Sequence, residues 1–181
     1  MKKIFLALLF SGLSLLSQAQ ETSSIERKND ITIDPILLLA VPALNVSYER
    51  VLTEDYGVGI NALVGLGDDS DNFTQFSPFF RMYFGKGFAS GFFVEGFIPV
   101  TTSDFETTYE TTYDPVTGYY NYYTDFEKKT TVGFGVGLGG KWVVKRNIVF
   151  EGSIGIARRF GGNLDYDNVT GKGMLGIGYR F

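Results

Sequence analysis

The chain has 181 residues, a net charge of −4, and neither cysteine nor histidine. The acidic balance argues against nucleic acid as a partner, and the lack of cysteine excludes disulfides and a lipid-modified cysteine. Without histidine or cysteine the chain lacks the usual nucleophile–base pairs and zinc ligands, so we expect no enzyme, no catalytic or metal site and no cofactor.

The N-terminus has the features of a secretory signal peptide. Lys2 and Lys3 give a positive start, residues 4–16 are apolar apart from serine and glycine, and Ser17-Gln18-Ala19 resembles a cleavage site. We expect residues 1–19 to be the signal peptide, residues 20–30 a flexible lead-in, and residues 31–181 a single domain. After Gln20 no apolar run approaches the roughly 18 residues that a membrane-spanning helix needs.

The remainder of the chain favours β-structure. Glycine contributes 23 residues and aromatic side chains 16% of the chain, and each glycine would weaken a helix by roughly 1 kcal/mol. Eight segments have the two-residue period of a strand: residues 31–40, 43–52, 57–67, 74–84, 91–101, 130–144, 147–160 and 172–181. An even number of strands is what a closed bacterial barrel requires, and closure leaves no unpaired edge in lipid.

The last segment shows the two faces of such a strand. Phe181, Tyr179, Ile177 and Leu175 fall on one face, whereas the other carries Arg180 and small residues. This alternation is typical of a membrane β-strand with an apolar side toward lipid and a polar side toward a lumen. The same assignment gathers aromatic residues in a girdle at the end of the barrel that carries Phe181: Phe84, Phe92, Trp142, Tyr179 and Phe181.

The links between the segments alternate in length. Residues 53–56, 85–90 and 145–146 form short links, whereas residues 68–73, 102–129 and 161–171 form longer, more polar ones. Outer-membrane barrels have short periplasmic turns and longer outer loops, so we place Phe181 on the periplasmic side. The first outer loop, around Val41-Pro42, is an exception because it is very short.

A water-soluble barrel with an apolar interior is the alternative fold. It would turn Arg81, Glu95, Lys141 and Glu151 into the solvent and bury the phenylalanine, valine and isoleucine face. Alternation alone does not separate the two folds. The signal peptide, the terminal phenylalanine, the aromatic girdle and the loop asymmetry favour an eight-stranded antiparallel up-and-down transmembrane β-barrel in the outer membrane.

In the membrane barrel the inward charges form pairs. Short turns would set Arg81 beside Glu95 and Lys141 beside Glu151, as structural ion pairs of a filled lumen. An ion pathway or a ligand site in the lumen is the competing interpretation, since eight strands leave room for side chains or one small ligand. The same register places large inward side chains opposite glycines, which favours filling: Phe93 opposite Gly139, Glu95 opposite Gly137 and Phe97 opposite Gly135.

Residues 102–129 form the most individual segment. The register of the flanking strands continues into it, and residues 114–118 contain a turn signal, so we expect a hairpin projecting roughly 30 Å. Its return arm carries four tyrosines, a residue common at binding surfaces: Tyr119, Tyr120, Tyr122 and Tyr123. Tyrosine is also simply a good strand former, so an outer contact surface for an extracellular partner remains one of two explanations.

The signal peptide, the strand alternation and the ending Gly178-Tyr179-Arg180-Phe181 resemble the small outer-membrane β-barrel family of OmpA-type, OmpX-type and porin-like proteins. The segment 45–52 is similar to a second-strand pattern in its uncharacterised members. The resemblance implies that Tyr179 and Phe181 are an assembly signal for the barrel assembly machinery and that lipid surrounds the wall. It implies a structural or surface-interaction role, with a narrow porin-like channel or hydrophobic-ligand carrier as the alternative and a lipid-modifying enzyme less supported.

Overall fold

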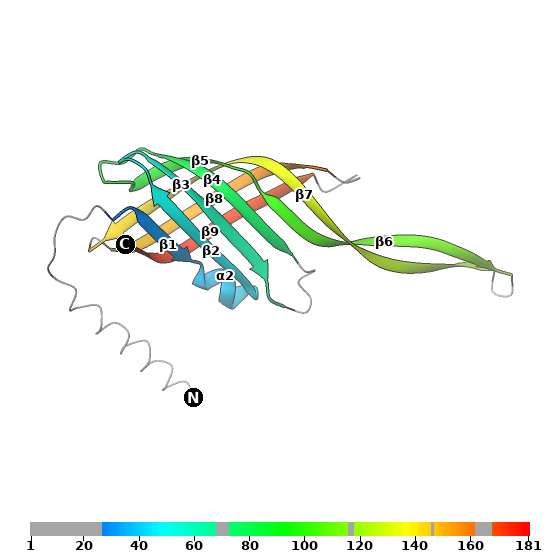
Figure 1. Ribbon diagram of the computed structural model, residues 1–181. Coiled ribbons are helices and arrows are strands. Elements are labelled where there is room, and N and C mark those ends of the chain that lie inside the picture. Colours follow the sequence, from blue (N-terminus) through cyan, green and yellow to red (C-terminus); the bar gives the residue numbers. More distant parts are fainter. Residues whose placement is uncertain (1–26, 68–72, 116–117, 146, 162–167) are drawn as a thin grey trace, which may run out of the picture.

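The computed structural model describes residues 27–67, 73–115, 118–145, 147–161 and 168–181. Within these residues the chain forms one helix and nine strands of a single antiparallel sheet (Figure 1). The expected signal peptide, residues 1–19, lies outside them. The elements are β1 (Asn29–Ile33), α2 (Pro35–Ala40), β2 (Ala43–Val51), β3 (Tyr56–Gly65), β4 (Thr74–Tyr83), β5 (Gly91–Phe97), β6 (Val100–Asp114), β7 (Tyr119–Val144), β8 (Ile148–Phe160) and β9 (Val169–Arg180).

The sheet closes into a barrel because β1 pairs with both β2 and β9. β2 pairs with β3, β3 with β4, β7 with β8 and β8 with β9, and every ladder is antiparallel. β5 and β6 both lie between β4 and β7, so they share one position in the ring. The described strands therefore occupy eight positions, which confirms the predicted all-β, eight-stranded antiparallel barrel.

Alternate side chains divide between the two faces of the wall as predicted. Along β4 the lumen side is buried and carries Gln75, Ser77, Phe79, Arg81 and Tyr83, whereas Phe76 and Phe80 are exposed on the outside. Along β7 the outer side chains are exposed: Val132, Phe134, Val136, Leu138 and Trp142. The register of each strand therefore determines which of its side chains face the lumen.

The prediction of a strand over residues 31–40 is wrong for the second half of that range. β1 ends at Ile33, and the short helix α2 begins at Pro35. Asp34 explains the change because its Oδ1 accepts the N–H groups of Ile36 (3.0 Å) and Leu37 (2.9 Å), which caps the helix. Proline is favoured at the first helical position, and the following leucines are good helix formers. The first outer connection consequently holds a helix rather than a very short turn.

The strand expected at residues 91–101 is interrupted at Ile98 and Pro99, which separate β5 from β6. Proline has no N–H to donate to a ladder. The register does not change across the break, because Phe97 pairs with Gly135 and Val100 pairs with Val132. The carbonyl of Pro99 still accepts the N–H of Gly133 at 2.9 Å.

β6 and the first part of β7 form the expected protruding hairpin. Their pairing runs without a gap from Val100 opposite Val132 to Ser103 opposite Lys129, and it continues to Asp114 opposite Tyr119 with one irregularity between Glu110 and Thr112. In Figure 1 this ribbon leaves the barrel and extends far beyond the other strands. The hairpin is thus a continuation of the barrel wall.

The opposite end of the barrel is closed by the turn between β4 and β5. Ala89 is fully buried, and its N–H donates to the carbonyl of Glu54 at 2.8 Å. Val51, Tyr83 and Phe93 pack around Ala89. Because Gly91 has φ +108°, the chain can turn back sharply into β5.

Among the described residues no helix is both long and apolar enough to cross a membrane.

Glycines of β7 make room for aromatic rings in the lumen. Phe97 pairs with Gly135, and a Cβ on Gly135 would lie 2.5 Å from Cζ of the Phe97 ring. Phe93 stands in the same relation to Gly139, at 2.6 Å. These distances are shorter than any van der Waals contact, so the rings and the glycines form one packing unit.

We predict that Gly135→Val destabilises the barrel by about 1–3 kcal/mol, because the added methyl groups overlap the Phe97 ring. The matched control is Gly96→Val on the outer face, where a Cβ would meet nothing within 4 Å. The measurement is the urea concentration at which half of the refolded protein loses its faster migration on an unboiled gel. Equal midpoints for the two variants would contradict the packing argument.

Candidate functional site

Eight buried charged side chains of the lumen, contributed by seven strands, are joined to one another by ion pairs. We call them the lumen charge cluster. They are four acids and four bases, so their formal charges cancel, and none is more than 5% exposed. They are Asp30 of β1, Glu49 of β2, Arg81 of β4, Glu95 of β5, Lys141 of β7, Glu151 of β8, and Lys172 and Arg180 of β9.

Arg81 lies at the centre of the cluster and binds three carboxylates. Its Nε donates to Glu95 at 2.8 Å, one terminal nitrogen donates to Glu49 at 2.8 Å, and the other donates to Glu151 at 2.6 Å. Glu95 is the neighbour across the β4–β5 ladder, whereas Glu49 and Glu151 lie across the lumen. The planar guanidinium suits this role because it presents five donors in fixed directions.

Two aromatic rings contact this guanidinium. Cζ of Arg81 lies 4.2 Å from the ring centre of Phe79 and 4.3 Å from that of Phe93. Both rings point inward from β4 and β5. Cation–π contacts of this kind gain strength when water is excluded. Arg81 therefore has aromatic partners in addition to its three carboxylates.

Lys141 makes its short contacts across the lumen as well. Its Nζ lies 2.6 Å from Glu49 and 3.0 Å from Asp30. Glu151, its neighbour on the adjacent strand, is opposite it in the ladder but its carboxylate lies 4.0 Å away. The pairing expected from the sequence is present, but the shorter pairs link β7 to β1 and β2.

The remaining bases are Lys172 and Arg180, both on β9. Lys172 forms an ion pair with Glu95 at 2.7 Å and lies over the ring of Phe79 at 4.3 Å. Arg180 binds Asp30 through two nitrogens, at 2.7 and 2.8 Å. The sequence analysis missed Asp30, which it placed in the lead-in, and Lys172. Both follow the inward period of their strands, so the period itself was the signal that could have identified them.

A neutral polar layer closes the lumen on the outer side of the charges. Gln75 is fully buried, and its Oε1 accepts the hydroxyls of Thr101 at 2.9 Å and Thr170 at 3.0 Å. Its Nε2 donates to the carbonyl of Gly171 at 3.2 Å. The side chain of Gln75 thus reaches from β4 to β9 across the barrel.

The described lumen is therefore filled by side chains. A cavity of about 930 Å³ lies over β4, β5, β7, β8 and β9, and outward-facing residues such as Phe80, Val136 and Ile156 line it. Inward positions such as Glu95 and Thr170 also border it. Within the described ranges no group of three or more acidic side chains has an arrangement that could hold a metal ion.

The structure places the other predicted residues at the two ends. Phe181 is exposed beside β1, where its N–H donates to the carbonyl of Asn29 at 2.8 Å, and the hydroxyl of Tyr179 accepts a bond from Asn147 at 2.7 Å. The backbones of Tyr119, Tyr120, Tyr122 and Tyr123 lie on the return arm of the hairpin. Their side chains lie outside what the structure describes, so the contact surface stays a prediction.

No known protein family matches this chain, and no curated protein matches it either. Among solved structures it is similar to the N-terminal β-barrel domain of Pseudomonas aeruginosa OprF, with 14% sequence identity and a TM-score of 0.49. The similarity covers 86% of this chain and 98% of that domain. The fold assignment rests on the strand pairings of this chain rather than on the similarity.

We predict that Arg81→Gln lowers the free energy of unfolding by about 3–5 kcal/mol, because Glu49, Glu95 and Glu151 would lose a shared buried counter-charge. Arg158→Gln is the control, since Arg158 is exposed on the outer face and its loss should cost less than about 1 kcal/mol. Urea titration of both variants in the same detergent measures the difference. A small effect at Arg81 would show that the cluster does not stabilise the barrel.

Proposed function

We propose that this protein is an outer-membrane β-barrel with a sealed lumen, which displays the β6–β7 hairpin outside the cell for contact with an extracellular partner. The observation that carries the proposal is the distribution of burial. Arg81 and Lys141 are buried inside, whereas the outer wall exposes phenylalanine, valine, isoleucine and leucine. A water-soluble barrel would have the opposite distribution, because burying apolar surface is what drives its folding.

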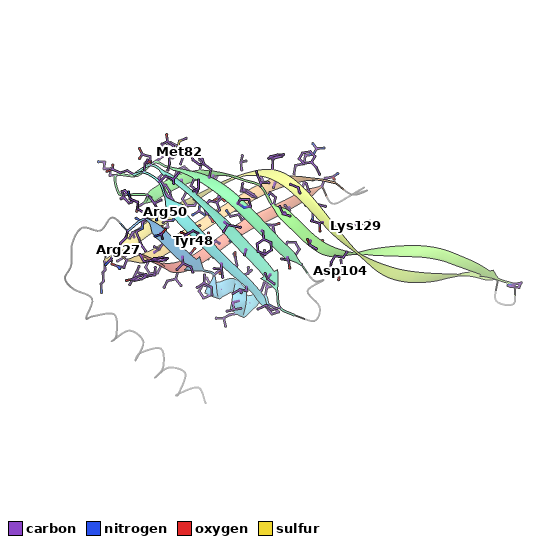
Figure 2. The ribbon with its side chains drawn as sticks, in the orientation of Figure 1. Arg27, Tyr48, Arg50, Met82, Asp104 and Lys129 are labelled. Atoms are coloured by element: carbon purple, nitrogen blue, oxygen red, sulfur yellow. The ribbon has the colours of Figure 1, made fainter. Side chains whose placement is uncertain are left out.

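Aromatic residues at the Phe181 end support the same placement. Trp142, Phe84 and Phe92 are exposed on the outer surface near the short turns, and the Phe84 and Phe92 rings lie 6.2 Å apart. Tyr48 lies on the outer face of β2 at the same end and donates to Asn29 at 2.9 Å (Figure 2). Aromatic residues with one polar group favour the boundary between hydrocarbon and water.

The hairpin supports the contact role through its open edges. β4 pairs with β6 only as far as Thr102, and the ladder of β8 with β7 ends at Val132. Beyond these residues both edges of the hairpin lack a strand neighbour in the described chain. Figure 2 labels Asp104 and Lys129 at the point where the hairpin leaves the barrel. An exposed strand edge can bind an extended partner segment through backbone hydrogen bonds.

A narrow channel is the second candidate, and conductance separates it from a sealed barrel. We predict that the refolded protein produces no stable open steps in planar bilayers at neutral pH. Moving an ion through the lumen would require breaking buried ion pairs around Arg81, each of which is expensive to disrupt. Reproducible steps from protein that migrates as a folded barrel would reject the sealed lumen and favour the channel.

Protease accessibility tests the location and orientation of the barrel. We predict that trypsin added to intact cells cuts after Lys128, which is exposed on the hairpin, and leaves Lys86 and Lys145 in the short turns uncut. Permeabilising the outer membrane should then expose both turns. The fragments are identified by mass spectrometry.

Two variants control this experiment. Replacing Lys128 and Lys129 together with glutamine should abolish the cut in intact cells. Deleting residues 105–127 should preserve the heat-dependent migration of the barrel, because the ladder below Ser103 does not depend on the deleted residues. Cutting at Lys86 in intact cells would overturn the orientation, and a protein recovered in the soluble fraction would overturn the membrane location.

A further inference from the structure

The wall of the barrel has a discontinuity beside β1. β9 pairs with β1 only between Ile177 and Arg180, and β2 pairs with β1 only from Val46 onward. Over the outer half of the barrel the described chain therefore has no strand between β2 and β9. The helix α2 lies in this position and contacts both strands (Figure 1). We call this gap, from Asp34 to Pro42 on one side and Gly171 to Leu175 on the other, the seam.

Side chains replace the missing ladder along β9. The N–H of Leu175 donates to Oδ2 of Asp34 at 2.8 Å, and Nδ2 of Asn45 donates to the carbonyl of Gly173 at 2.8 Å. Gln75 reaches the carbonyl of Gly171 through the lumen. In hydrocarbon an unsatisfied backbone group costs several kcal/mol, so these three side chains let β9 tolerate the gap.

A cavity of about 390 Å³ lies at the seam. The side chains that line it come from α2 and from both faces of the strands. Ile154 and Leu175 belong to the outer face, whereas Leu63, Ser153 and Met174 belong to the lumen face. Ile36, Leu37 and Ala40 of α2 complete the lining. The lining of the cavity therefore includes side chains from both faces of the wall.

The lining of this cavity suits an unbranched hydrocarbon chain. Its polar side chains are Asp34 and Ser153, and both have partners. The two Asp34 oxygens accept bonds from Ile36, Leu37 and Leu175, and the Ser153 hydroxyl donates to Glu151 at 3.4 Å. The volume falls near the lower end of the roughly 300–1,000 Å³ of small-ligand sites.

The outer mouth of the cavity is apolar as well. Of the lining residues, Ile36 of α2 is 55% exposed and Leu175 is 58% exposed. In a membrane these side chains would meet the acyl chains of the surrounding lipid. Met174 forms the inner wall, and its unbranched thioether side chain adapts readily to a neighbouring group.

We propose that the seam binds one acyl chain of a membrane lipid, which enters from the bilayer between α2 and β9 with its headgroup outside the cavity. The proposal rests on the proposed function, since it requires lipid around the barrel. It assigns α2 a purpose that a regular strand would not serve, because a continuous β1 would close the cavity. The ligand class is a straight acyl chain without recognition of its headgroup.

Photochemical labelling in a bilayer tests the site. The probe is phosphatidylcholine with a diazirine near the end of one acyl chain, and the protein is the full mature chain refolded into vesicles of this lipid. We expect label on Met174 and Ser153, whose side chains face the lumen. Phe93, which is buried near the other end of the barrel, should remain unlabelled.

A cavity-filling variant supplies the specificity control. Leu63→Trp places a larger ring in the cavity from β3 and should reduce label on Met174 by about tenfold, equivalent to about 1.4 kcal/mol. Ile60→Trp on the outer face of the same strand should leave it unchanged. Ala40→Trp, which fills the cavity from α2, is measured alongside it and should reduce the label in the same way.

Gel migration of each sample before and after boiling separates a failure of the acyl-chain site from a failure of the proposed membrane barrel. Protein that shows no migration difference before and after boiling would count against the barrel in the membrane itself. Folded protein in which Met174 is unlabelled, or labelled equally in wild type and both cavity variants, would overturn the acyl-chain site and leave the proposed function intact. Label on Met174 that both cavity variants suppress and Ile60→Trp retains would support it.

Discussion

The neutrality of the lumen charge cluster is the constraint on which the rest of the structure depends. Removing an ion from water costs several kcal/mol even after relaxation, and only well-placed counter-charges offset that cost. Arg81 meets three carboxylates from three other strands, so all three strands must be in register for the donors of the guanidinium to be satisfied. The cluster therefore specifies which strands meet across the lumen, in addition to the ladders that specify which strands are adjacent.

Neutralisation inside also determines the composition of the wall. Long charged side chains occupy the width of an eight-stranded barrel only if other inward positions are small. β7 supplies these positions with glycines opposite Phe93, Glu95 and Phe97. The outward positions of β7 carry large apolar residues, which are exposed on the outer wall. The alternation in its sequence reflects the different surroundings of its two faces, a packed lumen on one side and the outer surface on the other.

The sequence predicts well which side chains are neighbours in a ladder. It predicts poorly which side chains meet across the lumen. A two-residue period and short turns suffice to place Arg81 beside Glu95 and Lys141 opposite Glu151, because ladder geometry is local. The stronger contacts of Lys141 with Glu49 and Asp30 depend on the curvature of the closed ring, which no local pattern contains. The helix α2 was missed for another reason. Its apolar run has the length of a strand, and only the Asp34-Pro35 start favours a helix.

Both departures from regular strands occur where proline removes a ladder donor. Pro99 interrupts one position of the ring without changing its register, so the hairpin above it continues from the wall while β5 keeps the lumen packing below. After Pro35 the strand β1 does not resume, and α2 lies beside β9 instead. The polar groups of β9 then depend on Asp34, Asn45 and Gln75. A wall held by three side chains is easier to open than a ladder, and this difference supports the proposed lipid-chain site at the seam.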